Sequence, residues 1–130
     1  MLISEILDPL IQNFIIEKTG SDISKLSFQK NPFTGIDYKI ILNQIESRTK
    51  SKLKLPAWFN TINIIYPSKI SIEQTSSEIS AKYKSTLVCG DSLIDLTGGF
   101  GVDDYYFAKK MKSVLHCEIN TELSEIVAHN

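Results

Sequence analysis

The sequence lacks the features of a secreted or membrane-spanning protein. No apolar run approaches the roughly 18 residues of a spanning helix, and the first residues, Met1-Leu-Ile-Ser-Glu-Ile-Leu-Asp8, carry acids where a signal peptide has basic residues. The two cysteines, Cys89 and Cys117, lack metal-ligand spacing and are too few for a disulfide framework. The sequence therefore predicts a cytoplasmic protein with free thiols, no membrane contact and no metal site.

An excess of charge of one sign is also missing. The 14 Lys and Arg residues nearly balance the 15 Asp and Glu residues, which gives a net charge of -1 and no general attraction to nucleic acid. Contact with RNA would have to be local. Arg48, Lys50, Lys52 and Lys54 are candidates for it, but cations near a helix end also offset the helix dipole, and we favour that second role.

Helices are predicted along most of the first 90 residues. Asp8-Pro9 is a favourable helix start, and Gly20 is a favourable stop. Apolar residues at helical spacing and the caps predict helices at about 9–18, 21–26, 37–52 and 76–87. Residues 61–66 and 70–72 are predicted to be short extended segments, because they are rich in β-branched residues. Thr75 and Glu78 have the spacing of a capping box at the start of the last of these helices.

The pattern changes to alternating strands and helices after residue 91. Strands are predicted at about 92–96 and 113–118, with helices at about 102–110 and from 121 onward. This is one β-α-β unit. The sequence therefore predicts an α/β protein with two parts, a helical region over residues 1–70 and the start of a Rossmann-like domain over residues 71–130.

A glycine-rich loop follows the first predicted strand. Asp95 ends the strand, and Gly98, Gly99 and Gly101 come next, before a helix. Ligands bind at this end of parallel strands, where glycines let the backbone approach them. Glu118 stands at the end of the second strand, where an acid binds ribose hydroxyls. We interpret the loop as a cofactor loop; a ligand-free turn is the alternative.

Small differences in the loop favour one cofactor. A dinucleotide motif starting at Gly99 requires a glycine at position 104, where Asp104 stands beside Asp103, and two carboxylates repel a pyrophosphate. A Walker A loop requires Gly-Lys-Ser/Thr, which does not occur. S-adenosylmethionine is a cation without phosphate, so an acid-rich glycine loop suits it better.

The stretch Asp95-Leu-Thr-Gly-Gly-Phe-Gly101 resembles motif I of class I S-adenosylmethionine-dependent methyltransferases, with Thr97 in place of the first glycine. Glu118 resembles the acid of motif II. A closer resemblance is to a bacterial group related to trimethylguanosine synthase and to THUMP-like RNA-modifying proteins. It rests on further stretches of the chain: Ile72-Glu-Gln-Thr-Ser-Ser-Glu78, Tyr83-Lys84 and Ala128-His-Asn130, with Gln44-Ile-Glu-Ser-Arg48 and Lys54-Leu-Pro-Ala-Trp58 resembling that group's helical extension.

The resemblance implies roles for individual residues. Gly99 and Gly101 would pass under the methionine portion of the cofactor, Asp95 would receive its amino group, and Glu118 would hold its ribose. Secondary candidates for cofactor binding are Thr97, Gly98, Asp103 and Gln74. The catalytic motif of such enzymes, Asp/Asn-Pro-Pro-aromatic, does not occur in these 130 residues.

The sequence thus predicts the N-terminal portion of a methyltransferase that acts on RNA, inactive by itself because the catalytic motif is missing. Two alternatives are a non-catalytic binding module and a fragment of an NAD-binding oxidoreductase. Two strands alone leave unpaired edges and an uncovered apolar face, so we also expect self-association.

Other side chains have a plain interpretation. Trp58 and Tyr66 are typical packing residues, although aromatic rings also stack on bases. His116 and His129 have no matching acids or cysteines nearby in the sequence, so we expect no metal or base role for them.

Overall fold

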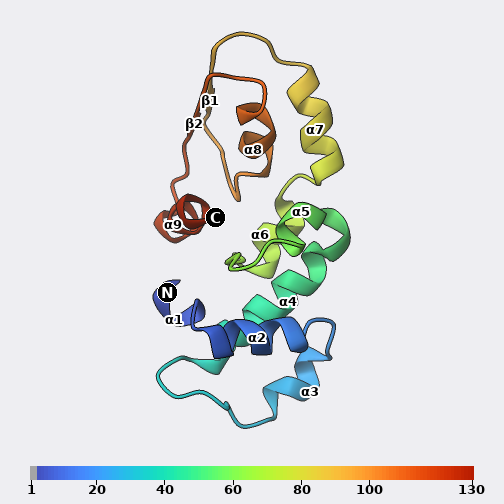
Figure 1. Cartoon of the computed structure of the whole chain (residues 1–130), viewed down its shortest axis with the longest axis vertical. Helices are drawn as coiled ribbons and strands as arrows, with labels where there is room; N and C mark the ends of the chain where they lie inside the picture. Colours follow the sequence, from blue (N-terminus) through green and yellow to red (C-terminus); the bar gives the residue numbers. More distant parts are fainter. Residues whose placement is uncertain (1–2) are drawn as a thin grey trace.

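The computed structural model describes residues 3–130, which form an elongated molecule with helices at one end and a small sheet at the other (Figure 1). The helical end contains α1 (Ile3–Ile6), α2 (Pro9–Glu17), α3 (Ile23–Ser27) and α4 (Tyr38–Lys54). The middle contains α5 (Pro56–Phe59) and α6 (Lys69–Gln74), and α7 (Glu78–Thr86) leads to the sheet. The last elements are β1 (Ser92–Asp95), α8 (Val102–Ala108), β2 (Ser113–His116) and α9 (Thr121–His129).

Side-chain caps explain where the helices at the helical end begin. Asp8 and Asp22 accept hydrogen bonds from the first free amides of α2 and α3, and Asp37 does the same for α4. These helices confirm the predicted ones to within two residues. Pro56 ends α4 and then takes the first position of α5, a short helix that the sequence interpretation did not include.

The two strands form the predicted β-α-β unit. β1 and β2 are parallel, with Leu93 opposite Val114 and Ile94 opposite Leu115, and α8 connects them. Among the described residues this two-stranded sheet is the only one. Ile94 and Leu115 are exposed, whereas Leu93 and Val114 are half-buried, so a single face of the sheet is covered.

The predicted extended segments at 61–66 and 70–72 are wrong. Residues 61–66 have no strand partner; instead the backbone N–H and C=O of Tyr66 pair with the Gln44 side chain, and those of Ile65 pair with the Asn130 side chain. Residues 70–72 lie within the helix α6, which begins because the Ser68 hydroxyl accepts a hydrogen bond from the Ser71 amide. Lys54 stabilises the other end of α6 by donating to the carbonyls of Ile72 and Glu73.

The predicted capping box at Thr75 and Glu78 is also wrong. Thr75 ends α6, and Ser77 is the residue that caps α7, through a hydrogen bond from the Ser80 amide. The Glu78 side chain turns inward, where its two oxygens accept from the Ala57 amide and the Tyr106 hydroxyl. Glu78 thereby joins α5, α7 and α8, and the phenolic pKa of Tyr106 is raised to about 12 by burial and by this carboxylate.

One continuous cluster of buried side chains runs through both ends of the molecule. It includes Ile41 and Ile45 of α4, Trp58 of α5, Val102 of α8 and Ile126 of α9. The division into a helical region and a Rossmann-like domain near residue 70 stays a prediction. Within residues 3–130, no helix combines the length and the apolar character that crossing a membrane requires.

Candidate cofactor site

The glycine loop is attached to the strand end on both sides. The Asp95 carboxylate accepts a hydrogen bond from the Thr97 amide at 2.9 Å, and the Gly101 amide closes the loop onto the Gly98 carbonyl at 2.9 Å. Beyond β2, the Cys117 amide donates to the Asp95 carbonyl and the Gly98 amide donates to the Cys117 carbonyl, both at 2.9 Å. The loop is therefore fixed against the end of β2 as well as β1.

Glu118 lies directly beside the loop. One carboxylate oxygen, Oε2, accepts from the Gly99 amide at 3.1 Å, and the other, Oε1, accepts from the Asn120 amide at 2.8 Å. A carboxylate has about four acceptor sites, so this geometry leaves acceptor capacity on Glu118 for hydroxyl groups. The structure thus brings Asp95, the glycines and Glu118 together at one edge of the sheet.

The glycines meet different requirements. Gly99 and Gly101 have positive φ angles of 55° and 76°, which disfavour other residues. Gly98 has no such angle, but a Cβ atom there would lie 2.1 Å from Nδ1 of His116, so the imidazole ring occupies the space of a side chain. Gly101 is also crowded, since its Cβ would lie 3.0 Å from Cγ1 of Val127 on α9.

Two secondary candidates lie away from the open side of the loop. Asp103 turns toward α7, where its Oδ2 accepts from the Ser76 hydroxyl and the Lys84 ammonium, each at 2.9 Å. Gln74 is an exposed residue at the end of α6, and no hydrogen bond joins it to the loop within the described part of the chain. The contacts of Asp103 are those of a support between α7 and α8.

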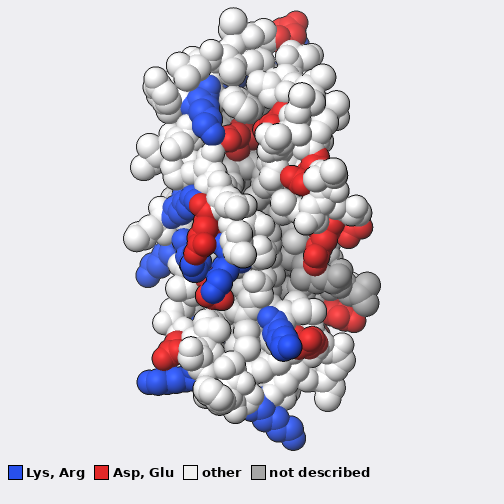
Figure 2. All heavy atoms as spheres, turned by 180° about the vertical axis from the view of Figure 1, so that it is seen from behind, with Lys and Arg blue, Asp and Glu red and all other residues white. Residues whose placement is uncertain are grey.

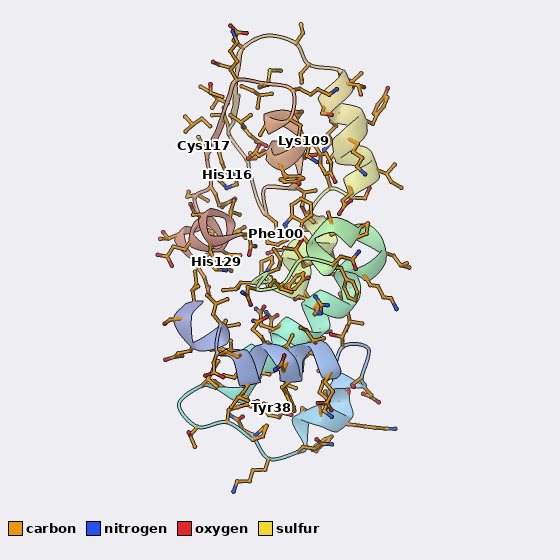
Figure 3. All side chains as sticks on the ribbon, in the orientation of Figure 1. Tyr38, Phe100, Lys109, His116, Cys117 and His129 are labelled. Atoms are coloured by element: carbon orange, nitrogen blue, oxygen red, sulfur yellow. The ribbon has the colours of Figure 1, made fainter. Side chains whose placement is uncertain are left out.

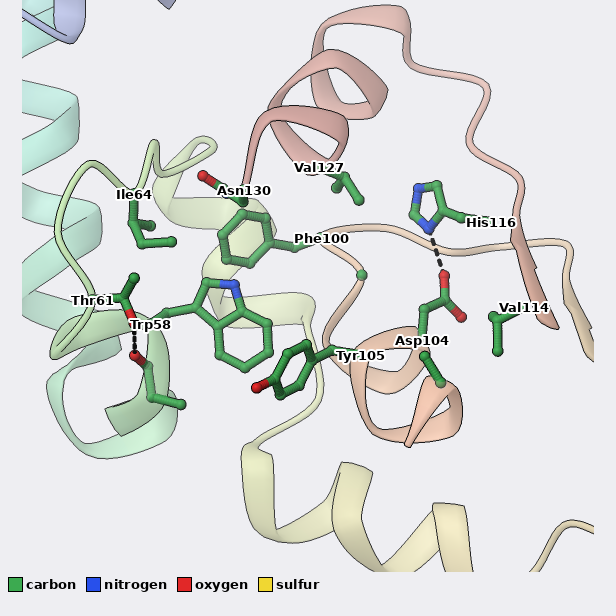
Figure 4. A pocket seen from close by; sticks show the side chains of 13 residues that line it. Trp58, Thr61, Ile64, Phe100, Asp104, Tyr105, Val114, His116, Val127 and Asn130 are labelled. Carbon is green, nitrogen blue, oxygen red and sulfur yellow. Dashed lines mark hydrogen bonds and ion pairs between the residues drawn. The ribbon is translucent and has the colours of Figure 1, made fainter. Parts of the chain in front are cut away.

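A buried acid–histidine pair lies next to the loop. Oδ2 of Asp104, on α8, is 2.5 Å from Nδ1 of His116, the last residue of β2 (Figure 4). Burial is the main cause that raises the pKa of Asp104, to about 6; the His116 hydrogen bond opposes this shift, and the neighbouring Asp95 carboxylate adds to it. The sheet edge therefore holds three carboxyl groups, on Asp95, Asp104 and Glu118.

A largely apolar cavity of about 430 Å³ opens on the inner side of this pair. Trp58, Phe100 and Tyr105 line one side of it, and His116 with Asp104 lines the other (Figure 4). Phe100 lies in the middle of the molecule, between the sheet and the helical end, whereas His116 and Cys117 lie along the strand (Figure 3). The Trp58 ring packs edge-on against the Tyr105 ring, with 5.1 Å between the ring centroids, and also packs against Phe100. These contacts confirm the predicted packing role of Trp58.

No family model matches the chain, and no curated protein matches it either. Among solved structures, the crystal structure of a putative methyltransferase from Porphyromonas gingivalis W83 superposes with a TM-score of 0.80 and 27% sequence identity. The match covers 98% of this chain and 31% of that protein. The chain has a methyltransferase-like fold.

In this methyltransferase-like fold, the sequence interpretation missed the Asp104–His116 pair. It treated Asp104 only as an obstacle to pyrophosphate and found no partner for His116. The two residues are twelve positions apart, and only the crossover of α8 onto β2 brings them together. The β-α-β prediction contained part of that signal, because Asp104 lies in the first turn of the crossover helix, beside the carboxyl ends of the strands.

The basic run on α4 is used for contacts within the methyltransferase-like fold. Arg48 donates to the Phe59 carbonyl and packs on the Phe59 ring, and Lys50 pairs with Glu73. Lys54 binds the end of α6. Lys69 also pairs with Glu46 at 3.0 Å. Basic and acidic side chains are interspersed over the face shown in Figure 2. Among residues 3–130, no cluster of three or more His, Cys, Asp or Glu side chains has a geometry suited to a metal ion.

Proposed function

We propose that this chain forms the cofactor-binding part of an S-adenosylmethionine-dependent methyltransferase. The observation that carries the proposal is the placement of Asp95, the glycine loop and Glu118 at one sheet edge, with Glu118 hydrogen-bonded to the Gly99 amide. The similarity over nearly the whole chain to a solved structure described as a putative methyltransferase supports the same activity class.

The residues at this edge fit the chemistry of the cofactor. Asp95 and Glu118 are acceptors for an ammonium group and for ribose hydroxyls respectively, while Gly99 and Gly101 present backbone without side chains. Three carboxyl groups favour a cationic ligand over a pyrophosphate. When bound, the cofactor supplies a methyl group on a cationic sulfur, and the residues of this chain bind and orient it.

The proposal also covers how this chain would correspond to a protein as long as the matched one. The chain spans about a third of the length of the solved methyltransferase it matches. We assign residues 1–70 to a helical extension and residues 71–130 to the start of the cofactor domain, and we place the transfer step outside these residues. RNA as the substrate, and membership of the THUMP-like group, rest on the sequence resemblance alone.

Calorimetric titration tests the proposal with S-adenosylhomocysteine and NADH as separate ligands. S-adenosylhomocysteine is expected to bind and NADH is not. Glu118→Ala should weaken binding about tenfold or more, because hydrogen bonds to a charged acceptor contribute about 1.5–3 kcal/mol each. Glu125→Ala, which removes an exposed acid of α9, is the matched control and should leave the affinity unchanged.

The opposite ligand preference would favour the oxidoreductase alternative. Equal affinities of the Glu118→Ala and Glu125→Ala variants would remove Glu118 from the site. Circular dichroism of each variant checks that losing the Gly99 contact has not unfolded the loop region.

A further inference from the structure

The Asp104–His116 pair contacts the proposed cofactor site from inside the protein. The Asp104 and His116 side chains are only 10% and 18% exposed, and their polar atoms lie 2.5 Å apart. The neighbouring acid Asp103 is engaged elsewhere, with Ser76, which precedes α7, and with Lys84 of α7. The pair is thus a separate buried unit between α8 and β2.

The imidazole ring of His116 is in direct contact with the glycine loop. It fills the space on the side-chain side of Gly98, where an added Cβ would fall within 3 Å of three ring atoms. It also approaches Gly101, with Cε1 4.0 Å from a Cβ built there. The ring therefore occupies the space directly beside the loop backbone, and a shift of the ring toward the loop would press on Gly98 and Gly101.

Asp95 links the pair to the ligand side of the loop. Its carboxyl group interacts with that of Asp104 by charge, and this repulsion helps to raise the pKa of Asp104. The groups acting on Asp104 are thus Asp95 from β1 and His116 from β2; Asp103, on the same helix, is paired with Lys84, and Glu118 binds Gly99. A proton on Asp104 relieves its repulsion by Asp95, which agrees with the raised pKa of Asp104 of about 6.

The outer polar atoms of the pair have no partners. Nε2 of His116 and Oδ1 of Asp104 are both buried and lack a hydrogen-bond partner among the described residues. An unpaired buried polar atom is unfavourable. The contact between Oδ2 of Asp104 and Nδ1 of His116 therefore fixes the position of both side chains.

We propose that Asp104 and His116 are positioning residues of the proposed cofactor site, which hold the glycine loop from the protein interior. In this proposal Asp104 releases a proton when a cationic group binds at Asp95. The inference rests on the proposed function for the identity of that cationic group. Burial is the main cause of the raised pKa of Asp104, and repulsion by Asp95 adds to it. Neutralising Asp95 removes that repulsion and lowers the pKa of Asp104, so near pH 6 a fraction of the Asp104 protons leaves to solvent.

The loop contact is tested first without ligand, by an NMR pH titration of the whole chain. The amide signals of Gly98, Gly99 and Gly101 should show a transition near pH 6. Asp104→Asn and His116→Asn, which keep amide groups near the original polar atoms, should each shift its midpoint by more than about half a pH unit. The double variant should lose the transition, and the control Glu125→Gln should keep it.

Two results would overturn the inference at this stage. One is a loop without any transition near pH 6 in the unsubstituted protein. The other is a double variant that keeps the same transition. Asp104→Asn is nearly isosteric, whereas His116→Asn removes the ring and keeps only an amide nitrogen near the position of Nδ1. If one variant fails to fold, the other single variant carries the same comparison.

Proton release is then measured by calorimetry with S-adenosylhomocysteine in buffers of different ionisation enthalpy. Near pH 6, where about half of the Asp104 groups carry a proton, we expect release of up to about half a proton per ligand. At pH 8 the release should be close to zero, and the double variant should release none at either pH.

The outcomes separate the two proposals. Binding without proton release at pH 6 contradicts the positioning inference and leaves the proposed function intact. Failure of S-adenosylhomocysteine to bind, together with the expected loop transition, contradicts the proposed function and supports the contact between the pair and the loop.

Discussion

Gly98 shows how a single residue type is fixed by a neighbour far away in the sequence. Its backbone angles suit any residue, yet the His116 ring stands 2.1 Å from where its Cβ would be. The requirement for glycine at this position is therefore steric and belongs to the pair of residues, whereas at Gly101 the positive φ angle adds a conformational requirement.

Gly98→Ala is expected to lower the free energy of unfolding by about 1–3 kcal/mol, because the methyl group displaces the His116 ring. In a His116→Ala background the same change should cost much less, since the ring is absent. Chemical denaturation of the two single variants and the double variant gives the coupling energy. Additive effects of the two substitutions would show that the ring and the loop do not interact.

Asp104 predicts a pH dependence of stability with a defined sign. Its pKa in the folded protein is raised from 3.8 to about 6, so the folded state binds more protons than the unfolded state between these values. Its contribution to stability is therefore present at low pH and is lost as the pH rises toward 6. Asp104→Asn lacks this loss.

The unfolding free energy of Asp104→Asn should thus rise relative to that of the unsubstituted protein as the pH increases from about 4 to about 6, and then level off. Urea denaturation at several pH values measures the difference. A difference that is constant over this range, or that falls with pH, would contradict the buried state of this carboxyl.

At the scale of elements, local sequence signals predicted what depends on local chemistry. The helices with an Asp cap and regular apolar spacing, and the β-α-β unit with its glycine loop, are where the sequence placed them. Residues 61–66 differ because their backbone partners are the side chains of Gln44 and Asn130, which lie 22 and 65 positions from Tyr66 and Ile65. No local pattern reveals such partners.

For the candidate site the same distinction holds. The placement of Asp95, the glycines and Glu118 at one edge follows from a parallel β-α-β arrangement, which the sequence predicts. The pairing of Asp104 with His116, and that of Asp103 with Lys84, depends on how α8 packs against β2 and α7, which periodicity alone does not specify.

Gln44 is the test of the side-chain pairing at residues 61–66. Its amide group is buried and bonds to both backbone groups of Tyr66, at 2.6 and 2.8 Å. Gln44→Ala should destabilise the protein by about 2–4 kcal/mol, since it leaves two buried polar groups without partners. The exposed Gln29→Ala should change stability little; similar losses in both variants, measured by thermal denaturation, would contradict this role for Gln44.

At the scale of the whole molecule, the uncovered side of the sheet is the main unexplained surface. Ile94 and Leu115 face outward from paired positions on β1 and β2, and Leu96 and Ile119 continue this apolar surface beyond the strand ends. A second exposed apolar set lies on α7, on the far side of α8 from the strands (Figure 1): Ile79, Tyr83 and, at the helix end, Leu87. Such surfaces are normally covered by another chain segment.

We therefore expect the isolated chain to self-associate through this surface. Sedimentation velocity should show dimers or larger species that increase with concentration. Leu115→Lys should reduce the association, whereas Leu53→Lys, at an even more exposed position on α4, should not. A chain that remains monomeric at millimolar concentration would contradict the expectation.

The central claim is that the glycine loop, Asp95 and Glu118 bind S-adenosylmethionine, and a crystal structure with S-adenosylhomocysteine tests it most directly. We expect the ligand at the carboxyl ends of β1 and β2. Its ribose hydroxyls should lie on Glu118, its amino group at Asp95, and its amino-acid portion against the backbone of Gly99 and Gly101. A ligand bound elsewhere, such as the cavity beside Trp58, or an unchanged loop at a saturating ligand concentration, would contradict it.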